Sequence, residues 1–544
     1  MSTASANRAP PRRLSELLRG MAAAPDDILV HGLTLDSRRV VAGDAFVALR
    51  GGTVHGMTFA PAALALGASA VIAEAPAPVA HEAEARGEGR GASEEQQSPA
   101  EHSSARIPDA RHDELHTTEE RTLAPRPSPL APVIWIDHLR DHVGEIAARF
   151  FGRPSESMNV IGVTGTNGKT SIVQLLASAL QVLGARAATI GTLGAGLVGA
   201  IDAGERTTPD VISVHALLAQ FRAAGASDVA MEVSSHALEQ GRVNAVAFTL
   251  AVFTNLTRDH LDYHGDMAAY GAAKSKLFAW PGLHAAIINV DDAFGCELAG
   301  SLPPDVKQLR YSSTSDAAAE IGARSIKSSA EGLRFTLHTP WGAGDIVTPL
   351  LGRFNIDNLL AVAACLGALG YDFSRIDQAL SSLQPVAGRM NRLGGSSDQP
   401  LVVVDYAHTP DALEQALTSL RAHCDGRLIC VFGCGGERDA GKRPQMGAIA
   451  ERLADRIVIT DDNPRGENGD AIVAQIVAGL ARPQDATVQR DRARAIALAL
   501  DEAGRGDAVL IAGKGHEPYQ EIGGIKHPFD DLVVARQRLE ARPC

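Results

Sequence analysis

The sequence lacks the cysteine pattern of a disulfide framework or a zinc site. Its six cysteines include no Cys-x-x-Cys pair, and we expect them to be reduced thiols. A basic balance is also missing: 51 Lys and Arg stand against 64 Asp and Glu, a net charge of -13, which argues against a general nucleic-acid-binding protein. A small anionic ligand remains possible, because a helix N-terminus and a few local cations are enough to bind phosphate.

Long apolar segments are missing too. The longest stretch without Asp, Glu, Lys or Arg, residues 51–73, is broken by glycines, His55 and Pro61, so no membrane span is predicted. The basic N-terminus is not followed by the apolar run of a signal peptide. We therefore expect a cytoplasmic protein that inserts into no membrane and binds no nucleic acid. A monomer is our expectation for its assembly.

Aromatic residues are scarce at 4%, whereas hydrophobic residues reach 45%, so the cores must consist mainly of Ala, Val, Leu and Ile. A length of 544 residues suggests three or four domains of about 150 residues each. We predict an N-terminal α/β domain at residues 1–156, a central domain at 157–386 and a C-terminal domain at 387–544. The fold class is α/β throughout.

A segment of different composition interrupts the first domain. Residues 76–132 are rich in Glu, Arg, Ser, Pro and Ala and nearly empty of β-branched and aromatic residues. Such a segment buries too little apolar surface to offset its ordering entropy, so we predict a disordered insertion. Strand-like runs flank it at residues 70–73 and 133–136, which indicates one interrupted domain rather than two.

The central and C-terminal domains alternate buried strands with helices, which predicts parallel sheets. In the central domain we expect strands at 159–164, 229–233, 248–253 and 285–290, and a helix at 172–183. In the C-terminal domain four apolar runs, 401–404, 428–432, 457–459 and 509–511, each precede a polar loop. Ligands of open α/β sheets bind beyond the carboxyl ends of the strands, so these four loops should line one face.

The strongest single motif follows the first strand of the central domain. It reads Thr-Gly-Thr-Asn-Gly-Lys-Thr from Thr164 to Thr170, between a strand and a helix. Its glycines let backbone N–H groups approach phosphate, Lys169 can reach the β- and γ-phosphates, and the Thr170 hydroxyl can bind Mg²⁺. A strict Walker A motif needs Gly at position 163, where this chain has Val. We predict a nucleotide-binding P-loop, and a plain turn is the alternative.

Two further features suggest metal chemistry. Glu232 ends the next buried strand, where a carboxylate can hold Mg²⁺ opposite Thr170; an exposed helix-starting Glu is the alternative. Residues 259–264 contain two Asp and two His, which could form a transition-metal site. Beside a P-loop, a second Mg²⁺ or a substrate role fits them better than zinc.

Together these residues resemble the Mur ligase family. The resemblance covers nearly the whole chain apart from residues 76–132 and the C-terminal tail. It rests on residues 165–170, Glu232, 255–260, 354–358, 388–389 and 405–410, which occur in the family's order. Marks of one subgroup are residues 36–38, 207–208, 234–236, 263–265, 462–465 and 513–517.

The resemblance implies a central P-loop ATPase domain, a Rossmann-like C-terminal domain and a small N-terminal domain that holds a UDP group. It implies an ATP-dependent amide ligase of peptidoglycan synthesis. The implied reaction adds meso-2,6-diaminopimelate to the D-glutamate of UDP-N-acetylmuramoyl-L-alanyl-D-glutamate through an acyl phosphate. ATP, Mg²⁺ and a CO₂-derived carbamate on Lys274 are the implied cofactors. Without the resemblance, Lys274 would be interpreted as an exposed helical lysine.

The resemblance also implies roles for individual residues. Lys169, Lys274, His260 and Glu232 are the implied catalytic residues, and the metal ligands are Thr170, Glu232, His260 and carbamylated Lys274. ATP would be bound by Gly165, Thr166, Asn167, Gly168, Lys169, Thr170, Asn355, Asn358, Arg389 and Asp405. The UDP-muramoyl dipeptide would be bound by Leu35, Ser37, Thr207, Thr208, Ser234, Gln240 and Arg242. The incoming amino acid would be bound by Arg438, Asp462, Asn463, Pro464, Arg465, Gly513 and Glu517.

Other functions fit parts of the pattern. A folylpolyglutamate synthase-like ligase shares the P-loop and the chemistry but lacks the motifs at 462–465 and 513–517 in this setting. A lysine-adding muramyl ligase differs only in its amino acid. A P-loop switch module without ligase activity is the alternative from another class, and the four loops of the C-terminal domain argue against it.

Overall fold

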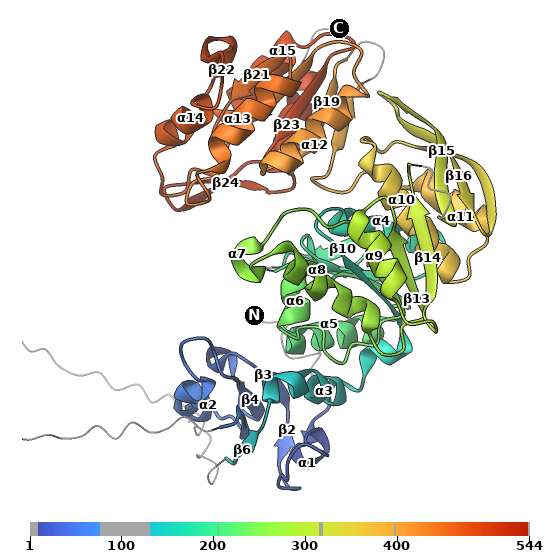
Figure 1. Ribbon diagram of the computed structural model, residues 1–544. Helices are drawn as coiled ribbons and strands as arrows, with labels where there is room; N and C mark the ends of the chain where they lie inside the picture. The colour runs from blue at the N-terminus through green and yellow to red at the C-terminus, as the bar shows by residue number, and fades with distance from the viewer. Residues whose placement is uncertain (1–8, 77–130, 205, 315–318, 396–398, 542–544) are drawn as a thin grey trace, which may run out of the picture. The chain divides into compact units, whose positions relative to one another are not determined.

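The structure is a computed structural model that describes residues 9–76, 131–204, 206–314, 319–395 and 399–541 (Figure 1). It forms two compact units, Met1–His142 and Val143–Cys544. The predicted insertion falls almost entirely outside the described residues. Five of the cysteines are free thiols; Cys430 and Cys434 are buried and Cys296 is exposed.

The first unit contains a four-stranded parallel sheet in the order β3-β4-β5-β6. Its strands are β3 (Gly32–Thr34), β4 (Asp44–Ala48), β5 (Ala70–Glu74) and β6 (Val133–Ile136). The other elements are β1 (Arg12–Arg13), α1 (Leu14–Leu17), β2 (Leu29–Val30), η1 (Ser37–Arg39), η2 (Gly56–Phe59) and α2 (Ala60–Ala65). Because β5 and β6 pair in parallel, the segments before and after the insertion belong to one sheet, as expected for an interrupted domain.

An eleven-stranded sheet organises the first part of the second unit. Its order is β10-β9-β8-β11-β7-β12-β13-β14-β15-β16-β17, and β8 through β15 pair in parallel. These strands are β7 (Asn159–Thr164), β8 (Ala187–Gly191), β9 (Gly194–Leu197), β10 (Ala200–Asp202), β11 (Asp228–Glu232), β12 (Leu250–Phe253), β13 (Ala285–Asn289), β14 (Lys307–Ser312), β15 (Ile321–Ser329), β16 (Gly332–Thr339) and β17 (Gly342–Thr348). The predicted parallel centre is confirmed, and antiparallel strands extend it at both edges.

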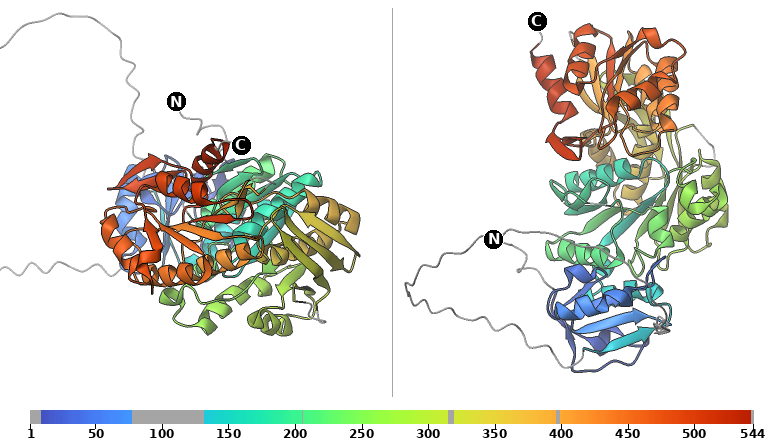
Figure 2. Two further views of the ribbon diagram at one scale, coloured as in Figure 1. Left: turned by 90° about the horizontal axis from the view of Figure 1, so that it is seen from above. Right: turned by 90° about the vertical axis from the view of Figure 1, so that its left-hand side faces the viewer.

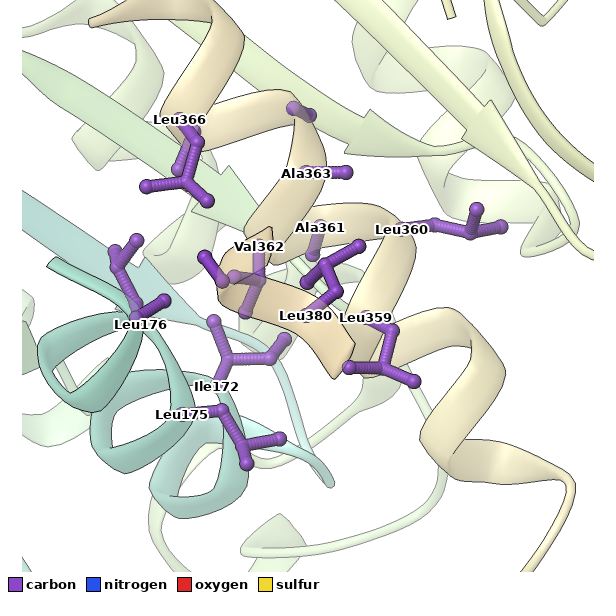
Figure 3. Packing of buried hydrophobic residues seen from close by; sticks show 14 of the residues in the cluster. Ile172, Leu175, Leu176, Leu359, Leu360, Ala361, Val362, Ala363, Leu366 and Leu380 are labelled. Carbon is purple, nitrogen blue, oxygen red and sulfur yellow. The ribbon is translucent and has the colours of Figure 1, made fainter. Parts of the chain in front are cut away.

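Helices cover both faces of this sheet, with α4 and α10 on one face and α5 and η4 on the other. The helices of this part are η3 (Pro154–Ser157), α4 (Lys169–Val182), α5 (Val211–Ala223), α6 (Ser235–Glu239), α7 (Leu261–His264), α8 (Met267–Ser275), η4 (Lys276–Ala279), α9 (Ala293–Ser301), α10 (Phe354–Ala368) and α11 (Phe373–Ser382). Helix α3 (Leu139–Phe151) begins in the first unit and precedes them. Aliphatic side chains of α4 and α10 pack against each other in the core, among them Leu176 and Val362 (Figure 3). This packing fixes the start of α4, which carries the P-loop.

A six-stranded sheet, β18-β19-β23-β20-β21-β22, organises the C-terminal part. The strands are β18 (Asn391–Gly394), β19 (Leu401–Asp405), β20 (Leu428–Phe432), β21 (Arg456–Ile459), β22 (Ala486–Val488) and β23 (Ala508–Ala512). The helices are α12 (Pro410–Arg421), α13 (Lys442–Leu453), α14 (Gly469–Val477), η5 (Pro483–Asp485), α15 (Arg492–Glu502) and α16 (Asp531–Glu540). A two-stranded ribbon, β24 (Tyr519–Ile522) and β25 (Ile525–Pro528), follows β23.

This sheet is doubly wound, as the pattern of alternating elements predicted. Helices α12, α13 and α14 pack on one face, and α15 and α16 pack on the other (Figures 1 and 2). Strands β19, β23, β20 and β21 run parallel to one another. The four polar loops that follow them therefore meet at one edge of the sheet, which confirms that expectation.

Candidate functional site

The P-loop has the tight backbone that its glycines predicted. Gly165 and Gly168 have φ values of 142° and 87°, which favour glycine. A Cβ at Gly165 would lie 1.8 Å from the hydroxyl of Thr254, and one at Gly168 would lie 2.9 Å from Oδ1 of Asn358. The loop then enters α4 at Lys169. A side chain at either glycine would therefore push the loop away from Thr254 or Asn358. Exposed backbone N–H groups at a helix N-terminus are the arrangement that binds phosphate oxygens.

The two side chains predicted to hold Mg²⁺, Thr170 and Glu232, contact each other. The hydroxyl of Thr170 donates to Glu232 with an O–O distance of 3.0 Å. Thr192 donates to the same carboxylate through its backbone N–H at 2.8 Å and its hydroxyl at 3.2 Å. Strand pairing explains this geometry, because β11 runs parallel to β7 and sets Glu232 opposite Val163, just before the P-loop.

These residues open onto a cavity of about 530 Å³ within the second unit. Twelve of the residues implicated by the sequence line it: Thr166, Asn167, Gly168, Lys169, Thr170, Thr207, Glu232, Ser234, His260, Asn358, Arg389 and Asp405. Arg389 and Asp405 come from the C-terminal part of the chain, and the others come from the P-loop part. The structure thus brings together most of the nucleotide-binding residues that the sequence suggested.

Lys274 lies under the P-loop rather than in the cavity wall. It is 1% exposed, and its Nζ donates to the carbonyl of Gly165 at 2.8 Å. The Nζ of Lys169 donates to the same oxygen, also at 2.8 Å. Burial, with the nearby charge of Lys169, lowers the pKa of Lys274 to about 6. Burial also lowers the pKa of Lys169. The interpretation of Lys274 as an exposed helical lysine is therefore wrong.

The described residues provide few protein ligands for a cation. His260 lines the cavity with a positive φ of 54°, and its Nε2 lies 3.4 Å from Asp259. No group of three or more His, Cys, Asp or Glu side chains in the described ranges could hold a metal by itself. A hydroxyl and a carboxylate beside a phosphate cradle nevertheless fit Mg²⁺, which keeps several waters and takes phosphate oxygens as ligands.

The two asparagines of α10 differ in position. Asn358 lines the cavity, whereas Asn355 does not. The side-chain amide of Asn355 donates to the carbonyl of Leu351 at 2.7 Å, and its Oδ1 accepts from Asn358 at 2.8 Å. Asn355 therefore orients Asn358. Asp405, on the facing part of the chain, accepts from the backbone N–H groups of Met390 and Ala407.

The residues suggested for amino-acid binding form a second cluster. They lie on the loops after β20, β21 and β23, and the described cavity wall contains none of them. Asn463 donates to Glu517 at 2.8 Å, and the fully buried Lys514 donates to Oδ1 of Asn463 at 2.9 Å. Burial raises the pKa of Asp462, whose Oδ1 has no hydrogen-bond partner in the described structure.

One contact links this cluster to the cavity. The backbone N–H of Gly513, after β23, donates to the carbonyl of Asp405, after β19, at 3.1 Å. Asp405 lines the cavity. Arg438 is exposed, and its Nη1 donates to the carbonyl of Glu437 at 3.4 Å. Pro464 and Arg465 follow Asn463 in the loop after β21.

The residues suggested for the UDP-muramoyl dipeptide fall in both units. Thr208 donates to the carbonyl of Glu232 at 2.8 Å and lies 3.4 Å from Ser234. Arg242 donates to the carbonyl of Thr208 at 3.0 Å and to the side chain of Gln240. These residues therefore adjoin Thr207 and Ser234 in the cavity wall. Leu35 and Ser37 belong to the first unit, at the loop after β3 and the start of η1.

Sequence reasoning missed several cavity residues. Asp291, Asp292 and Asp357 line its wall, together with Thr192, Asn289, Tyr311 and Gln415. Burial raises the pKa of Asp357 to about 6, and its Oδ1 has no hydrogen-bond partner in the described structure. A signal was available, because Asn289 ends a buried strand and Asp291 and Asp292 follow it, at the same sheet edge as Glu232.

The fold and the cavity define a P-loop nucleotide-binding protein with a doubly wound C-terminal domain. Comparison with known sequences makes the class specific. The profile of the Mur ligase middle domain matches residues 163–366, the Mur ligase glutamate ligase domain matches 388–515, and the Mur ligase family catalytic domain matches 29–151. The chain belongs to the Mur ligase family.

Named relatives cover nearly the whole chain. A UDP-N-acetylmuramoyl-L-alanyl-D-glutamate--2,6-diaminopimelate ligase from Xanthomonas campestris pv. campestris is 55% identical over 97% of both chains. One with the same name from Pseudomonas aeruginosa is 49% identical over 95% of this chain and 96% of its own. A solved structure of a ligase with this name is 34% identical, with a TM-score of 0.68 over 98% of this chain and 99% of its own.

More distant structures share the fold. A Mycobacterium tuberculosis folylpolyglutamate synthase, solved with ADP and AMPPCP, is 19% identical, with a TM-score of 0.56 over 74% of this chain and 95% of its own. That likeness concerns the fold alone.

In the described part of the chain, no helix combines the length and the apolar character that a membrane crossing needs.

Proposed function

We propose that the protein is an ATP-dependent ligase of peptidoglycan synthesis. It joins meso-2,6-diaminopimelate to the D-glutamate of UDP-N-acetylmuramoyl-L-alanyl-D-glutamate. The observation that carries this proposal is the cavity in which the P-loop and Glu232 face Arg389 and Asp405, one hydrogen bond away from the loop after β23. That loop is in turn bonded to the loop after β21 through Lys514 and Asn463. The names of relatives at 49–55% identity support the choice of substrates.

The chemistry requires activation of a carboxylate, which is a poor electrophile. The γ-phosphoryl group of ATP passes to an oxygen of the glutamate γ-carboxylate, and ADP leaves. The amine of the incoming amino acid then attacks the carbonyl carbon, and phosphate leaves as the amide forms. Both partners of the first step are anions, so the site must offset their repulsion.

The chain's own residues suit that task. The P-loop N–H groups and Lys169 neutralise the phosphates, and Thr170, Glu232 and His260 would hold Mg²⁺. The ion, when bound, lowers the charge on the phosphoryl oxygens and orients them. Asn358, Arg389 and Asp405 line the cavity from two parts of the chain and would contact the nucleotide there.

Lys274 is proposed to act as a carbamate. Carbamylation needs a neutral amine, and burial lowers the pKa of Lys274 to about 6, which leaves the amine largely neutral at pH 7. Two ammonium groups sharing the carbonyl of Gly165 would repel each other, whereas a carbamate beside Lys169 attracts it. The carbamate would also supply the metal with an oxygen ligand.

Arg465 and Arg438 are proposed to bind the distal carboxylate of diaminopimelate, and Glu517 its ammonium. The dipeptide would contact Thr207, Thr208, Ser234, Gln240 and Arg242 in the second unit, and Leu35 and Ser37 in the first. We place the reaction in the cytoplasm and propose that the enzyme acts as a monomer.

The test is ADP release with the UDP-dipeptide and a panel of amino acids. Diaminopimelate should support turnover, and lysine should be a poor substrate because it lacks the second carboxylate. Equal use of lysine would favour a lysine-adding ligase. Turnover with folate and glutamate, and none with the UDP-dipeptide, would favour the folylpolyglutamate synthase alternative.

A further inference from the structure

The loops proposed to bind the amino acid are joined by a buried arginine that the sequence did not single out. Arg443 lies in the first turn of α13 and is 1% exposed. It comes from neither the loop after β20, which carries Arg438, nor the loop after β21, which carries Arg465. Its side chain contacts Gly435 in the first loop and Glu467, two residues after Arg465, in the second.

Arg443 makes a two-pronged ion pair with Glu467. Its Nη1 lies 2.6 Å from Oε1 of Glu467 and its Nη2 lies 2.8 Å from Oε2. Nη2 also donates to the carbonyl of Gly435 at 3.2 Å, and Nη1 donates to Gln475 at 2.7 Å. One side chain thus binds the loop after β20 directly and the segment after Arg465 through Glu467.

Glu467 completes the connection. It accepts the backbone N–H of Glu437 at 3.0 Å, and its own N–H donates to the carbonyl of Pro464 at 3.0 Å. Glu437 has a positive φ of 54°, a conformation that a non-glycine residue keeps only when its surroundings hold it. The hydrogen bonds from Arg443 and from the backbone N–H of Glu437 lower the pKa of Glu467 to about 2, so its carboxylate stays ionised.

Backbone groups of Gly436 and Asn463 connect the loop after β20 to Arg465. Nη1 of Arg465 donates to the carbonyl of Gly436 at 2.8 Å, and the N–H of Gly436 donates to the carbonyl of Asn463 at 2.9 Å. The two loops lie in close contact at this point, because a Cβ at Gly436 would lie 1.9 Å from the carbonyl oxygen of Pro464. The Arg465 guanidinium is thus held between the carbonyl of Gly436 and the carboxylate of Glu521, 3.6 Å from its Nε, so we expect a shift of the loop after β20 to change its direction.

We propose that Arg443 and Glu467 are a positioning pair that sets the orientation of Arg465 and thereby the preference for diaminopimelate over lysine. The inference rests on the proposed function. Neither residue is assigned a contact with substrate. Their effect comes from fixing two loops relative to each other, since a guanidinium reads a carboxylate well only when both N–H groups point at it.

The two-pronged geometry makes the choice of cation specific. A lysine at position 443 keeps the charge but offers no planar fork, so it cannot hold both oxygens of Glu467 and the carbonyl of Gly435 at once. The Arg443→Lys and Glu467→Gln variants should therefore fold and still misplace the loops. Arg452→Lys is the matched control, because Arg452 lies on the same helix, is 56% exposed and pairs with Glu414 at 2.9 Å.

The experiment measures kcat and KM for all three substrates of the wild type and the three variants, with thermal midpoints. Arg443→Lys and Glu467→Gln should each raise KM for diaminopimelate by about tenfold, a change of about 1.4 kcal/mol. KM for ATP and for the UDP-dipeptide should change less than about twofold, and the preference for diaminopimelate over lysine should fall. Arg452→Lys should match the wild type.

Several outcomes would overturn the inference. An equal rise in KM for all three substrates would show that the pair has only a structural role. An unchanged KM for diaminopimelate in both variants would show that the pair does not position Arg465. If Arg443→Lys does not fold, Glu467→Gln decides alone, since Glu467 is 30% exposed and tolerates an isosteric change. Failure of the wild type itself to use diaminopimelate would instead refute the proposed function, so the two failures are distinguishable.

Discussion

Replacing Lys274 by Met should abolish turnover and stabilise the fold. The pKa of Lys274 falls from 10.5 to about 6, so between those two pH values the unfolded chain binds a proton that the native chain does not. Stability therefore rises with pH across this window, and at pH 7 the buried lysine costs up to about 5 kcal/mol, from about 1.36 kcal/mol per pH unit. The cost disappears as the pH approaches 10.5.

The net gain must be smaller than that cost. Met removes the hydrogen bond to the carbonyl of Gly165, which is worth about 1 kcal/mol, and a similar-sized apolar side chain repacks at a cost below about 1.5 kcal/mol. We therefore expect Lys274→Met to stabilise the second unit by roughly 2–3 kcal/mol at pH 7 in CO₂-free buffer. Bicarbonate should raise the thermal midpoint of the wild type and leave that of the variant unchanged.

The assay is chemical denaturation at pH 7 and at pH 9.5, with ADP release measured in parallel. Lys276→Met is the control, because Lys276 is 50% exposed and bonded to Glu239, so its loss should change stability by less than about 0.5 kcal/mol. A destabilised Lys274→Met protein at pH 7, or a gain that grows with pH, would refute the reasoning. Near-normal turnover of the variant would refute the carbamate.

Two further predictions rest on described contacts, and a third rests on the composition of the insertion. Arg465→Ala should raise KM for diaminopimelate at least about tenfold, with KM for ATP nearly unchanged, because the loss of a charge-assisted contact costs about 2–5 kcal/mol; an equal change for both substrates would contradict this. Arg492→Met should lower stability by about 3–5 kcal/mol in urea unfolding, because Arg492 and Asp531 form an ion pair that is 0% exposed on both sides; a loss below about 1 kcal/mol would contradict it. Replacing residues 77–130 by a Gly/Ser linker of about a dozen residues, the shortest span for a parallel crossover, should preserve turnover; a tenfold fall would show that the segment contributes to function.

The parallel core of the fold could be predicted from the sequence because its strands are continuous apolar runs. Residues 285–288 and 428–432 are such runs, and both lie in buried strands of parallel sheets. Strands β15, β16 and β17 were not predicted. Their residues alternate in burial and include Arg324, Lys327 and Arg334, so a long apolar run is missing and only pairing with neighbours reveals them.

The residues of the candidate site were predictable wherever they end or directly follow a buried strand. Glu232 and Asp405 end buried strands, and both line the cavity. Residues that act on other residues left no such signal. Asn355 orients Asn358 instead of lining the cavity, and Arg443 lies in a helix between two loops. Such roles depend on side-chain direction and burial, which a spacing in the sequence does not encode.

The hydrogen bond between Thr170 and Glu232 has a consequence for how the site takes up a cation. The hydroxyl hydrogen of Thr170 points at the carboxylate, so its lone pairs are left for an incoming ion. The anchoring of Glu232 by Thr192 holds the carboxylate in place. If these residues hold Mg²⁺ as proposed, the two side chains are already oriented by the chain's own hydrogen bonds before the ion binds.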